Sequence, residues 1–278
     1  MMIPSHDDTR MAANLLAHTA VISYEPLISV IMTAHNTERW VEAATTSILQ
    51  QTWNNLELLV VDDQSSDRTL EKLIALQRTD HRIRVLMMNR NGGTYAARNA
   101  AMDYVKGEVI TFMDSDDYSH PDRLKLQLEA LRAPQIVVST CNYERRDDAG
   151  QLVMNRGLAA RQALVSLMFK RVVIDEIGWF DSVRFGADDE YFERLRYVYG
   201  RSSHVNVDTT LYTALWRPDS LANNPTTGTN ISEPTSEPLS PPRQRYKESF
   251  TAWHASFAGT GKTPYVPRKS SFRQFQAT

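Results

Sequence analysis

The sequence has little cysteine, no long apolar run and no excess of positive charge, and each shortage excludes a class of protein. Cys141 is the only cysteine among 278 residues, which excludes an intramolecular disulfide and a Cys-x-x-Cys metal site. No apolar run reaches the ~18 residues of a membrane helix, and a net charge of −2 is unlike that of a nucleic-acid-binding protein. The first residues lack the basic and apolar pattern of a secretory signal. We therefore expect a cytoplasmic protein with no transmembrane segment and no nucleic-acid partner. Peripheral association with the inner face of the membrane stays open.

Short apolar runs alternate with amphipathic stretches through the first half of the chain. The runs are rich in β-branched and large apolar residues, as buried strands are. Helix-like stretches separate them, and this alternation is typical of βαβ units. The sequence therefore predicts an α/β fold with a mostly parallel, Rossmann-like central sheet flanked by helices. The predicted strands are 27–34, 56–61, 83–88, 108–113 and 135–140.

The second half of the chain is less regular. Residues 161–181 are interpreted as helix or strand pieces that end near Gly178, and residues 188–200 as a helix stopped by Gly200. Residues 223–242 are rich in Pro, Ser, Thr and Gly, which favours a linker. Beyond it, aromatic residues recur at helical spacing and predict a C-terminal helix that packs on the main domain or binds a partner. These residues are Tyr246, Phe250, Trp253 and Phe257.

Polar and acidic residues stand where the predicted strands end. Asp62 and Asp63 follow one strand, the run Asp-Ser-Asp-Asp from Asp114 to Asp117 follows another, and residues 33–36 follow the first. In an open α/β sheet, ligands bind outside the carboxyl ends of the strands. Closely spaced carboxylates suit Mg²⁺ or Mn²⁺, and Mg²⁺ commonly adds substrate phosphates as ligands. The sequence therefore predicts a site for a divalent cation and a phosphate group.

The acidic run fits neither a calcium-binding EF-hand nor a phosphatase motif well. An EF-hand loop starting at Asp114 requires glycine at its sixth position and glutamate at its twelfth, where Ser119 and Lys125 stand. A phosphatase of the haloacid dehalogenase type also begins with Asp-x-Asp after an apolar strand. That family usually has Thr or Val where Tyr118 stands, and its motif usually lies near the start of the domain.

Five segments, in order, resemble the family 2 glycosyltransferases of the GT-A fold. They are "ISVIMTAHN", "SILQQTWNNLELLVVDDQSSDRT", "NGGTYAARNAA", "GEVITFMDSDDYSHPDRL" and "GWFDSVRFGADDEYFERL". The resemblance covers residues 26–221. It implies an N-terminal extension (1–25) and a GT-A domain (26–222), followed by a linker with a C-terminal helix (223–278). Within the domain, 26–117 would bind the nucleotide and 118–222 the acceptor.

The resemblance also implies an enzyme with a nucleoside-diphosphate sugar donor, UDP-sugar favoured. Asp63 would accept a hydrogen bond from the base, and Arg98 would face the diphosphate. A divalent cation, Mn²⁺ or Mg²⁺, would be held by one or two of Asp114, Asp116 and Asp117, whose separate roles stay open. The residues expected to bind the nucleotide-sugar are Thr33, Ala34, His35, Asn36, Glu38, Asp62, Asp63, Gly93, Arg98, Asp114, Ser115 and Asp116.

Asp188 is the expected general base by this resemblance, with Asp189 as the alternative. It would take the proton from the acceptor hydroxyl in a single displacement that inverts the anomeric configuration. Glu190 is expected to pair with Arg194 at i,i+4 instead. The chain departs from the family at two places: Ala187 stands where a glutamate usually precedes the base, and no histidine stands near residues 217–219.

We expect a saccharide or lipid-linked saccharide acceptor, as in the synthesis of bacterial surface polysaccharide or glycolipid. The alternative is a catalytically silent module that binds sugar nucleotides inside a larger assembly. The aromatic C-terminal helix is a candidate surface for homo-oligomer formation. Neither the sugar nor the linkage can be inferred from the residues.

Overall fold

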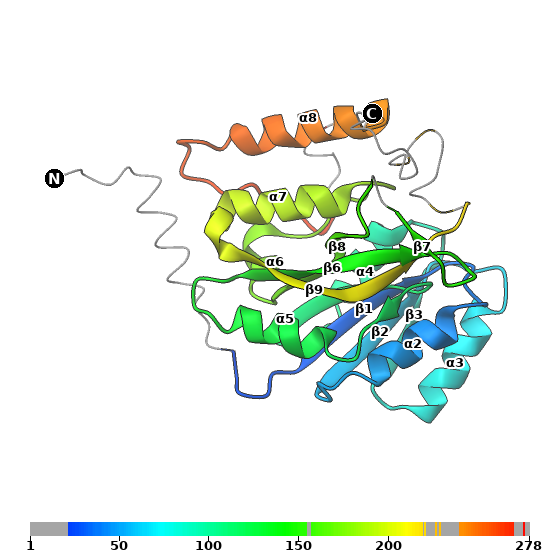
Figure 1. Cartoon of the computed structure of the whole chain (residues 1–278). Coiled ribbons are helices and arrows are strands. Elements are labelled where there is room, and N and C mark those ends of the chain that lie inside the picture. The colour runs from blue at the N-terminus through cyan, green and yellow to red at the C-terminus, as the bar shows by residue number, and fades with distance from the viewer. Residues whose placement is uncertain are drawn as a thin grey trace.

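One mixed β-sheet forms the centre of the protein, seen in a computed structural model (Figure 1). Among the described residues the sheet has nine strands in the order β3-β2-β1-β4-β8-β6-β9-β5, and β7 pairs with β6. The structure describes residues 22–154, 157–218, 220, 226, 228, 239–269 and 275.

The first four strands of the sequence form its parallel half. They are β1 (Ile28–Ala34), β2 (Leu56–Asp62), β3 (Ile83–Met87) and β4 (Val109–Asp114). Every residue of β1 and β2 is buried, as expected for parallel strands covered on both faces. The connecting helices are α2 (Val41–Leu49), α3 (Thr69–Thr79) and α4 (Thr94–Met102). The predicted βαβ units are therefore present.

The second half of the sheet contains antiparallel pairs. Strand β8 (Ala160–Lys170) lies antiparallel to both β4 and β6 (Val138–Arg146). Strand β9 (His204–Leu215) runs parallel to β6 and pairs with the short β5 (Tyr118–Ser119). Strand β7 (Leu152–Val153) is antiparallel to β6. The sheet is thus parallel over strands β1 to β4 and mixed beyond them, because no helix crosses over between β6 and β8.

Helices cover both faces of the sheet and enclose two apolar cores. Helices α2, α3 and α5 (Arg123–Leu131) pack on one face. On the other face lie α4, α6 (Val173–Ile177), α7 (Ala187–Tyr199) and α8 (Pro241–Ala255), with the 3₁₀ turn Arg201–Ser203 after α7. Figure 1 shows α8 lying along α7 on the side away from α2 and α3. In the described part of the chain, no helix has the length and apolarity needed to cross a membrane.

The C-terminal helix packs on its own chain. Tyr246 and Phe250 of α8 are buried in the core, and His254 Nε2 lies 3.0 Å from Glu190 Oε1 of α7. Glu190 also forms the predicted i,i+4 pair with Arg194, with both side chains fully buried. The aromatic face expected to be available for self-association is therefore largely covered within the chain. Most of the predicted linker 223–242 lies outside the described residues.

Candidate functional site

The carboxyl ends of the parallel strands meet at one edge of a large cavity, as predicted. Thr33 of β1 stands opposite Asp114 of β4, and Ala34 stands opposite Asp62 of β2. The cavity has a volume of about 1030 Å³ and is lined by both halves of the sheet, α7 and the start of α8. It is therefore large enough for a ligand of nucleotide-sugar size.

Most of the residues expected from the sequence line this cavity. They are Thr33, Ala34, His35, Asn36, Asp63, Gly93, Arg98, Asp114, Ser115, Asp116, Asp117 and Asp188.

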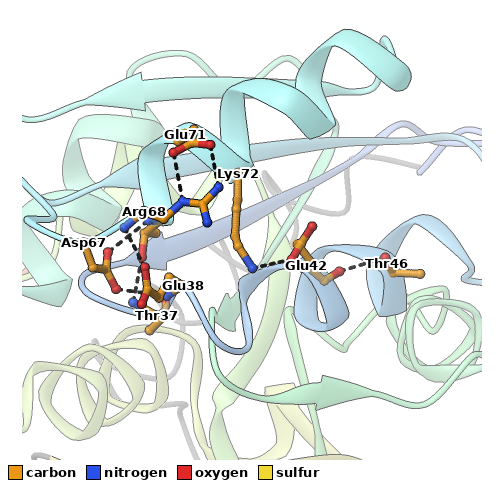
Figure 2. Close-up of polar contacts among 9 residues, drawn as sticks. Thr37, Glu38, Glu42, Thr46, Asp67, Arg68, Glu71 and Lys72 are labelled. Atoms are coloured by element: carbon orange, nitrogen blue, oxygen red, sulfur yellow. Dashed lines mark hydrogen bonds and ion pairs between the residues drawn. The ribbon is translucent and has the colours of Figure 1, made fainter.

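Glu38 and Asp62, which the sequence also predicts to bind the ligand, are not among the residues that line the cavity. The Glu38 carboxylate accepts a hydrogen bond of 2.8 Å from the backbone N–H of Arg68, just before α3. Asp67 in turn accepts one from the backbone N–H of Glu38, and Figure 2 shows this exchange. Asp62 is buried and accepts from the N–H of Ser65 at 3.2 Å. Both carboxylates hold loops that shape the edge of the cavity.

Asp63 holds the glycine loop that precedes α4. Its two carboxylate oxygens accept hydrogen bonds from the backbone N–H groups of Gly92 and Gly93, each at 2.7 Å. Gly93 has a φ of +84°, in the region that favours glycine. The His35 ring lies 2.9 Å from the backbone oxygen of Asp63. The loop at the expected nucleobase pocket is therefore held by the Asp63 carboxylate, whose two oxygens already accept hydrogen bonds from backbone N–H groups.

Arg98 contacts the acidic run directly. Its Nη2 lies 3.1 Å from Asp114 Oδ1, and its side chain is almost fully buried. The guanidinium lies over the Phe112 and Phe180 rings, at 4.9 and 5.8 Å from their centroids. Its Nε and Nη1 are buried and have no hydrogen-bond partner among the described residues. Buried donors of this kind are costly unless they gain an acceptor, which suits a site for an anion.

Asp116 pairs with an arginine from the segment after β9. Arg217 Nη2 lies 2.7 Å from Asp116 Oδ2, and its guanidinium stacks over Trp40 at 4.7 Å from the ring centroid. Burial raises the pKa of Asp116, while the positive charge of Arg217 lowers it and the negative charge of Asp114 raises it further. Asp116 therefore favours a neighbouring cation. Asp219, the other charged residue of this segment, lies outside the described residues.

Asp117, the third candidate metal ligand, also lines the cavity and is held by two hydrogen bonds to the β9 strand. Its two oxygens accept hydrogen bonds from the Tyr212 hydroxyl at 2.7 Å and from the backbone N–H of Leu215 at 2.8 Å. Burial and the charges of Asp116 and Asp114 raise its pKa well above the usual value. The carboxylate therefore fastens β9 to the end of β4.

A divalent cation fits this arrangement only with ligands from the substrate. Among the described residues, no cluster of three or more His, Cys, Asp or Glu side chains could hold a metal ion. Asp114 and Asp116 both line the cavity, and each has one carboxylate oxygen in an ion pair with arginine. Two carboxylates are enough when diphosphate oxygens complete the shell, as is common for Mg²⁺.

Asp188 also lines the cavity, in the first turn of α7. Its Oδ1 accepts a hydrogen bond of 2.6 Å from the Tyr95 hydroxyl. Burial and the charge of Asp188 raise the pKa of Tyr95 well above its usual value, so this phenol stays a donor. Asp188 is therefore held in place by a group from a distant segment.

Asp189 also lines the cavity but lies near α8. Desolvation and the negative charge of Asp188 raise the pKa of Asp189 to about 7, while the positive charges of Arg243 and Lys247 of α8 lower it. Solvent reaches the side chain from the cavity and screens part of this repulsion. The two aspartates thus have different neighbours although they are adjacent in sequence.

Tyr95 and Arg184 were not among the residues expected from the sequence. Arg184 Nη1 lies 2.7 Å from Asn91 Oδ1, and so joins the glycine loop to the segment before α7. Tyr95 stands within a motif segment, and its hydroxyl meets Asp188 only after folding. The sequence carried no local signal for either contact, because the partners are more than 90 residues apart.

Solved structures share this fold. The TarS protein of S. aureus (residues 1–349, in complex with UDP) aligns with a TM-score of 0.55 and 22% identity, covering 69% of this chain and 61% of that one. The mannosyltransferase PcManGT of Pyrobaculum calidifontis, in complex with GDP-Man and Mn²⁺, aligns with a TM-score of 0.53 and 19% identity, covering 74% and 62%. These likenesses confirm the GT-A fold class expected from the sequence.

The family model described as "Glycosyl transferase family 2" matches residues 29–192, more than half of the chain. The chain belongs to glycosyl transferase family 2. Among curated family members, the UDP-Glc:alpha-D-GlcNAc-diphosphoundecaprenol beta-1,3-glucosyltransferase WfgD of Escherichia coli is 40% identical over 118 residues, 42% of this chain and 46% of that protein.

Another relative is the putative teichuronic acid biosynthesis glycosyltransferase TuaG of Bacillus subtilis. It is 34% identical over 121 residues, 44% of this chain and 48% of that protein. The chain therefore spans about half the length of these relatives.

Proposed function

We propose that this chain transfers a glycosyl group from a nucleoside-diphosphate sugar, with UDP-sugar favoured, to an acceptor hydroxyl. The observation that carries the proposal is the cavity itself, which brings the acidic strand end, Arg98 and Asp188 of α7 into one lining. The complexes of TarS with UDP and of PcManGT with GDP-Man support a sugar-nucleotide donor.

The donor half of the cavity would bind the nucleotide and its diphosphate. His35 and the loop held by Asp63 would contact the nucleobase, and Arg98, with its unpaired buried donors, would face the diphosphate. Asp114 and Asp116 would hold a divalent cation, Mn²⁺ or Mg²⁺. When bound, the cation would supply Lewis-acid stabilisation of charge on the leaving group.

Asp188 would act as the general base for the acceptor hydroxyl. Its carboxylate needs to reach that proton, and the Tyr95 hydrogen bond fixes its position. Attack from the face opposite the diphosphate inverts the anomeric configuration. The WfgD and TuaG relatives support an acceptor in bacterial surface polysaccharide or glycolipid synthesis, and we propose a cytoplasmic site of action.

Calorimetry with UDP and an activity screen with a panel of sugar nucleotides test this proposal. We expect UDP to bind several-fold more tightly with Mn²⁺ than with EDTA, because the acidic run faces an anionic diphosphate. Asp116→Asn should reduce that difference. The matched control Asp148→Asn changes an exposed carboxylate outside the cavity and should leave it intact.

Two results would count against the proposal in different ways. Equal UDP affinity with and without metal would show that the acidic run does not hold a cation for the diphosphate. Metal-dependent binding without turnover of any donor, including hydrolysis, would favour the silent binding module. That alternative is supported by Ala187, which is buried. Its methyl side chain has no ionisable group, whereas the family usually has a glutamate at this position.

A further inference from the structure

The chain just before α7 is joined to helix α4 at two places. Asn99 of α4 and the backbone of Phe180 exchange two hydrogen bonds, of 2.8 and 3.0 Å. Nearer the cavity, the Tyr95 hydroxyl donates a hydrogen bond of 2.6 Å to Asp188. These contacts fix residues 180–188 to the helix itself, which begins at Thr94.

Arg184 joins the same stretch of chain to the loop that precedes α4. Its Nη1 donates a hydrogen bond of 2.7 Å to Asn91 Oδ1, and its Nη2 donates one of 3.0 Å to the backbone oxygen of Asn91. The guanidinium is a rigid fork, so a contact at two points fixes direction as well as distance. Below, the glycine loop means residues 91–93, and the pre-helix segment means residues 181–186.

The glycine loop forms one hydrogen-bonded unit with Asp63. The N–H groups of Gly92 and Gly93 donate to its two carboxylate oxygens, and the side-chain amide of Asn91 donates to its backbone oxygen at 3.3 Å. The His35 ring, expected at the nucleobase, lies 2.9 Å from that same backbone oxygen. A nucleotide bound against this unit would therefore restrain Asn91 as well.

The pre-helix segment leads directly into the first turn of α7. Phe185 packs edge-on against Tyr246 of α8, with the ring centroids 6.1 Å apart. Gly186 has a φ of +74° and stands at the start of α7, and a Cβ at this position would lie 3.5 Å from the Tyr246 ring. The chain between Arg184 and Asp188 is thus short and packed, so a restraint on the first residue restrains the second.

Arg184 is placed to affect the site more than the fold. It is exposed and lines the cavity, and exposed polar contacts contribute little to folding stability. Buried contacts in the same region hold the fold, such as the hydrogen bonds between Asn99 and Phe180. Removal of the Arg184 guanidinium should therefore leave a folded protein in which this side chain no longer joins the glycine loop to the pre-helix segment.

We propose that Arg184 is a positioning residue that couples nucleotide binding to the placement of Asp188. Coupling between sites travels through contiguous contacts, and here the contacts run from the glycine loop through Asn91 and Arg184 to the first turn of α7. A nucleotide that holds the loop thereby holds the base in position. The inference rests on the proposed function, because it names a positioning residue for the base of the same cavity.

Hydrogen exchange of backbone amides with and without UDP and Mn²⁺ tests the coupling directly, because exchange reports local opening. In the wild type we expect saturating UDP to slow exchange in residues 91–97 and in residues 181–190. In Arg184→Gln the slowing should remain in residues 91–97 and fall at least about fivefold in residues 181–190, since coupling between sites is typically about 5–150-fold. The matched control Arg78→Gln removes an exposed charge of α3 outside the cavity and should behave as the wild type.

Turnover of the sugar nucleotide separates positioning from direct contact with the nucleotide. Arg184→Gln should lower kcat at least about fivefold and change the donor KM by a smaller factor. Arg184→Lys keeps the charge without the two-point contact and should lose nearly as much. In an Asn91→Ala background the further effect of Arg184→Gln should shrink at least about threefold, because residues that act through one contact are not additive.

Three results would overturn the inference. One is equal slowing of residues 181–190 by UDP in Arg184→Gln and in the wild type, and another is no slowing of these residues in a wild type that binds UDP. The third is full rescue by lysine with an undiminished effect in the Asn91→Ala background, which would assign Arg184 to direct contact with the nucleotide. Failure of the wild type to bind UDP would instead contradict the proposed function, so the two failures are distinguishable.

Discussion

Replacing Asp188 with asparagine should separate proton transfer from nucleotide binding. In the structure, Asp188 Oδ1 accepts a hydrogen bond of 2.6 Å from the Tyr95 hydroxyl. The amide oxygen of asparagine can accept the same bond, so the first turn of α7 should keep its geometry. The amide cannot take up a proton from an acceptor hydroxyl. Asp188→Asn therefore removes the proposed base with little change in structure.

The expected loss is the contribution of general-base catalysis. That contribution is typically ~10²–10⁴-fold in rate, which corresponds to about 3–5 kcal/mol of activation free energy at 1.36 kcal/mol per tenfold change. The hydrogen bond from Tyr95 contributes less, because a bond to a charged acceptor is worth ~1.5–3 kcal/mol. Tyr95→Phe should therefore reduce turnover by a smaller factor than Asp188→Asn.

The assay measures transfer with one donor and one acceptor, together with UDP affinity, for both aspartate variants. Asp189→Asn is the matched control, since consecutive helix residues project about 100° apart and Asp189 lies near Arg243 and Lys247 of α8. We expect Asp188→Asn to lose turnover and keep UDP affinity. A large loss in Asp189→Asn with a small one in Asp188→Asn would move the base by one residue. Full activity in both variants would refute the assignment of the base to α7.

Three further changes test other parts of the site. Asp63→Ala should lower the free energy of unfolding by about 1–3 kcal/mol and also weaken UDP binding, because two glycine N–H groups lose their acceptor. Urea unfolding and calorimetry measure the two effects. Unchanged values would show that Asp63 has neither role. The pKa of Asp189 is raised to about 7 in the folded protein, so the folded state binds more protons than the unfolded state between about pH 4 and 7. The contribution of this group to the free energy of unfolding should therefore fall as the pH rises through that window. The stability of Asp189→Asn relative to wild type should be higher at pH 8 than at pH 5. A stability difference between the two proteins that does not change with pH would contradict the raised pKa. Glu190→Ala should destabilise the protein by ~3–5 kcal/mol in thermal or urea unfolding, because it leaves the buried Arg194 charge without its partner. A loss below about 1 kcal/mol, the value of a salt bridge on the surface, would refute that account.

The sequence by itself determined the parallel half of the fold and the edge at which the site lies. The apolar runs at 27–34, 56–61, 83–88 and 108–113 became β1 to β4 within one or two residues at each end, because strands buried on both faces need continuous apolar residues. The polar residues that end three of these strands could also be placed at one edge of the sheet from the sequence, because parallel strands bring their carboxyl ends to the same edge. The helix at 188–200 and its end at Gly200 were likewise local features.

Only the tertiary structure decided what each acidic group contacts. Asp114 meets Arg98, Asp116 meets Arg217, and Asp117 meets Tyr212. In the sequence the three aspartates are nearly equivalent, because composition and spacing say nothing about which distant segment will approach each one. The partner of Asp117 is 95 residues away.

The same limit applies to the antiparallel half of the sheet and to the part of the cavity that β6 and β8 line. The pairing of β8 with β4 and β6 joins segments that have no local pairing signal such as a tight turn. That pairing sets the register that brings Arg161 beside Tyr143 and Arg145. Local patterns fix which residues form strands, whereas long-range strand pairing fixes which side chains meet, and the chemistry of this cavity depends on the second.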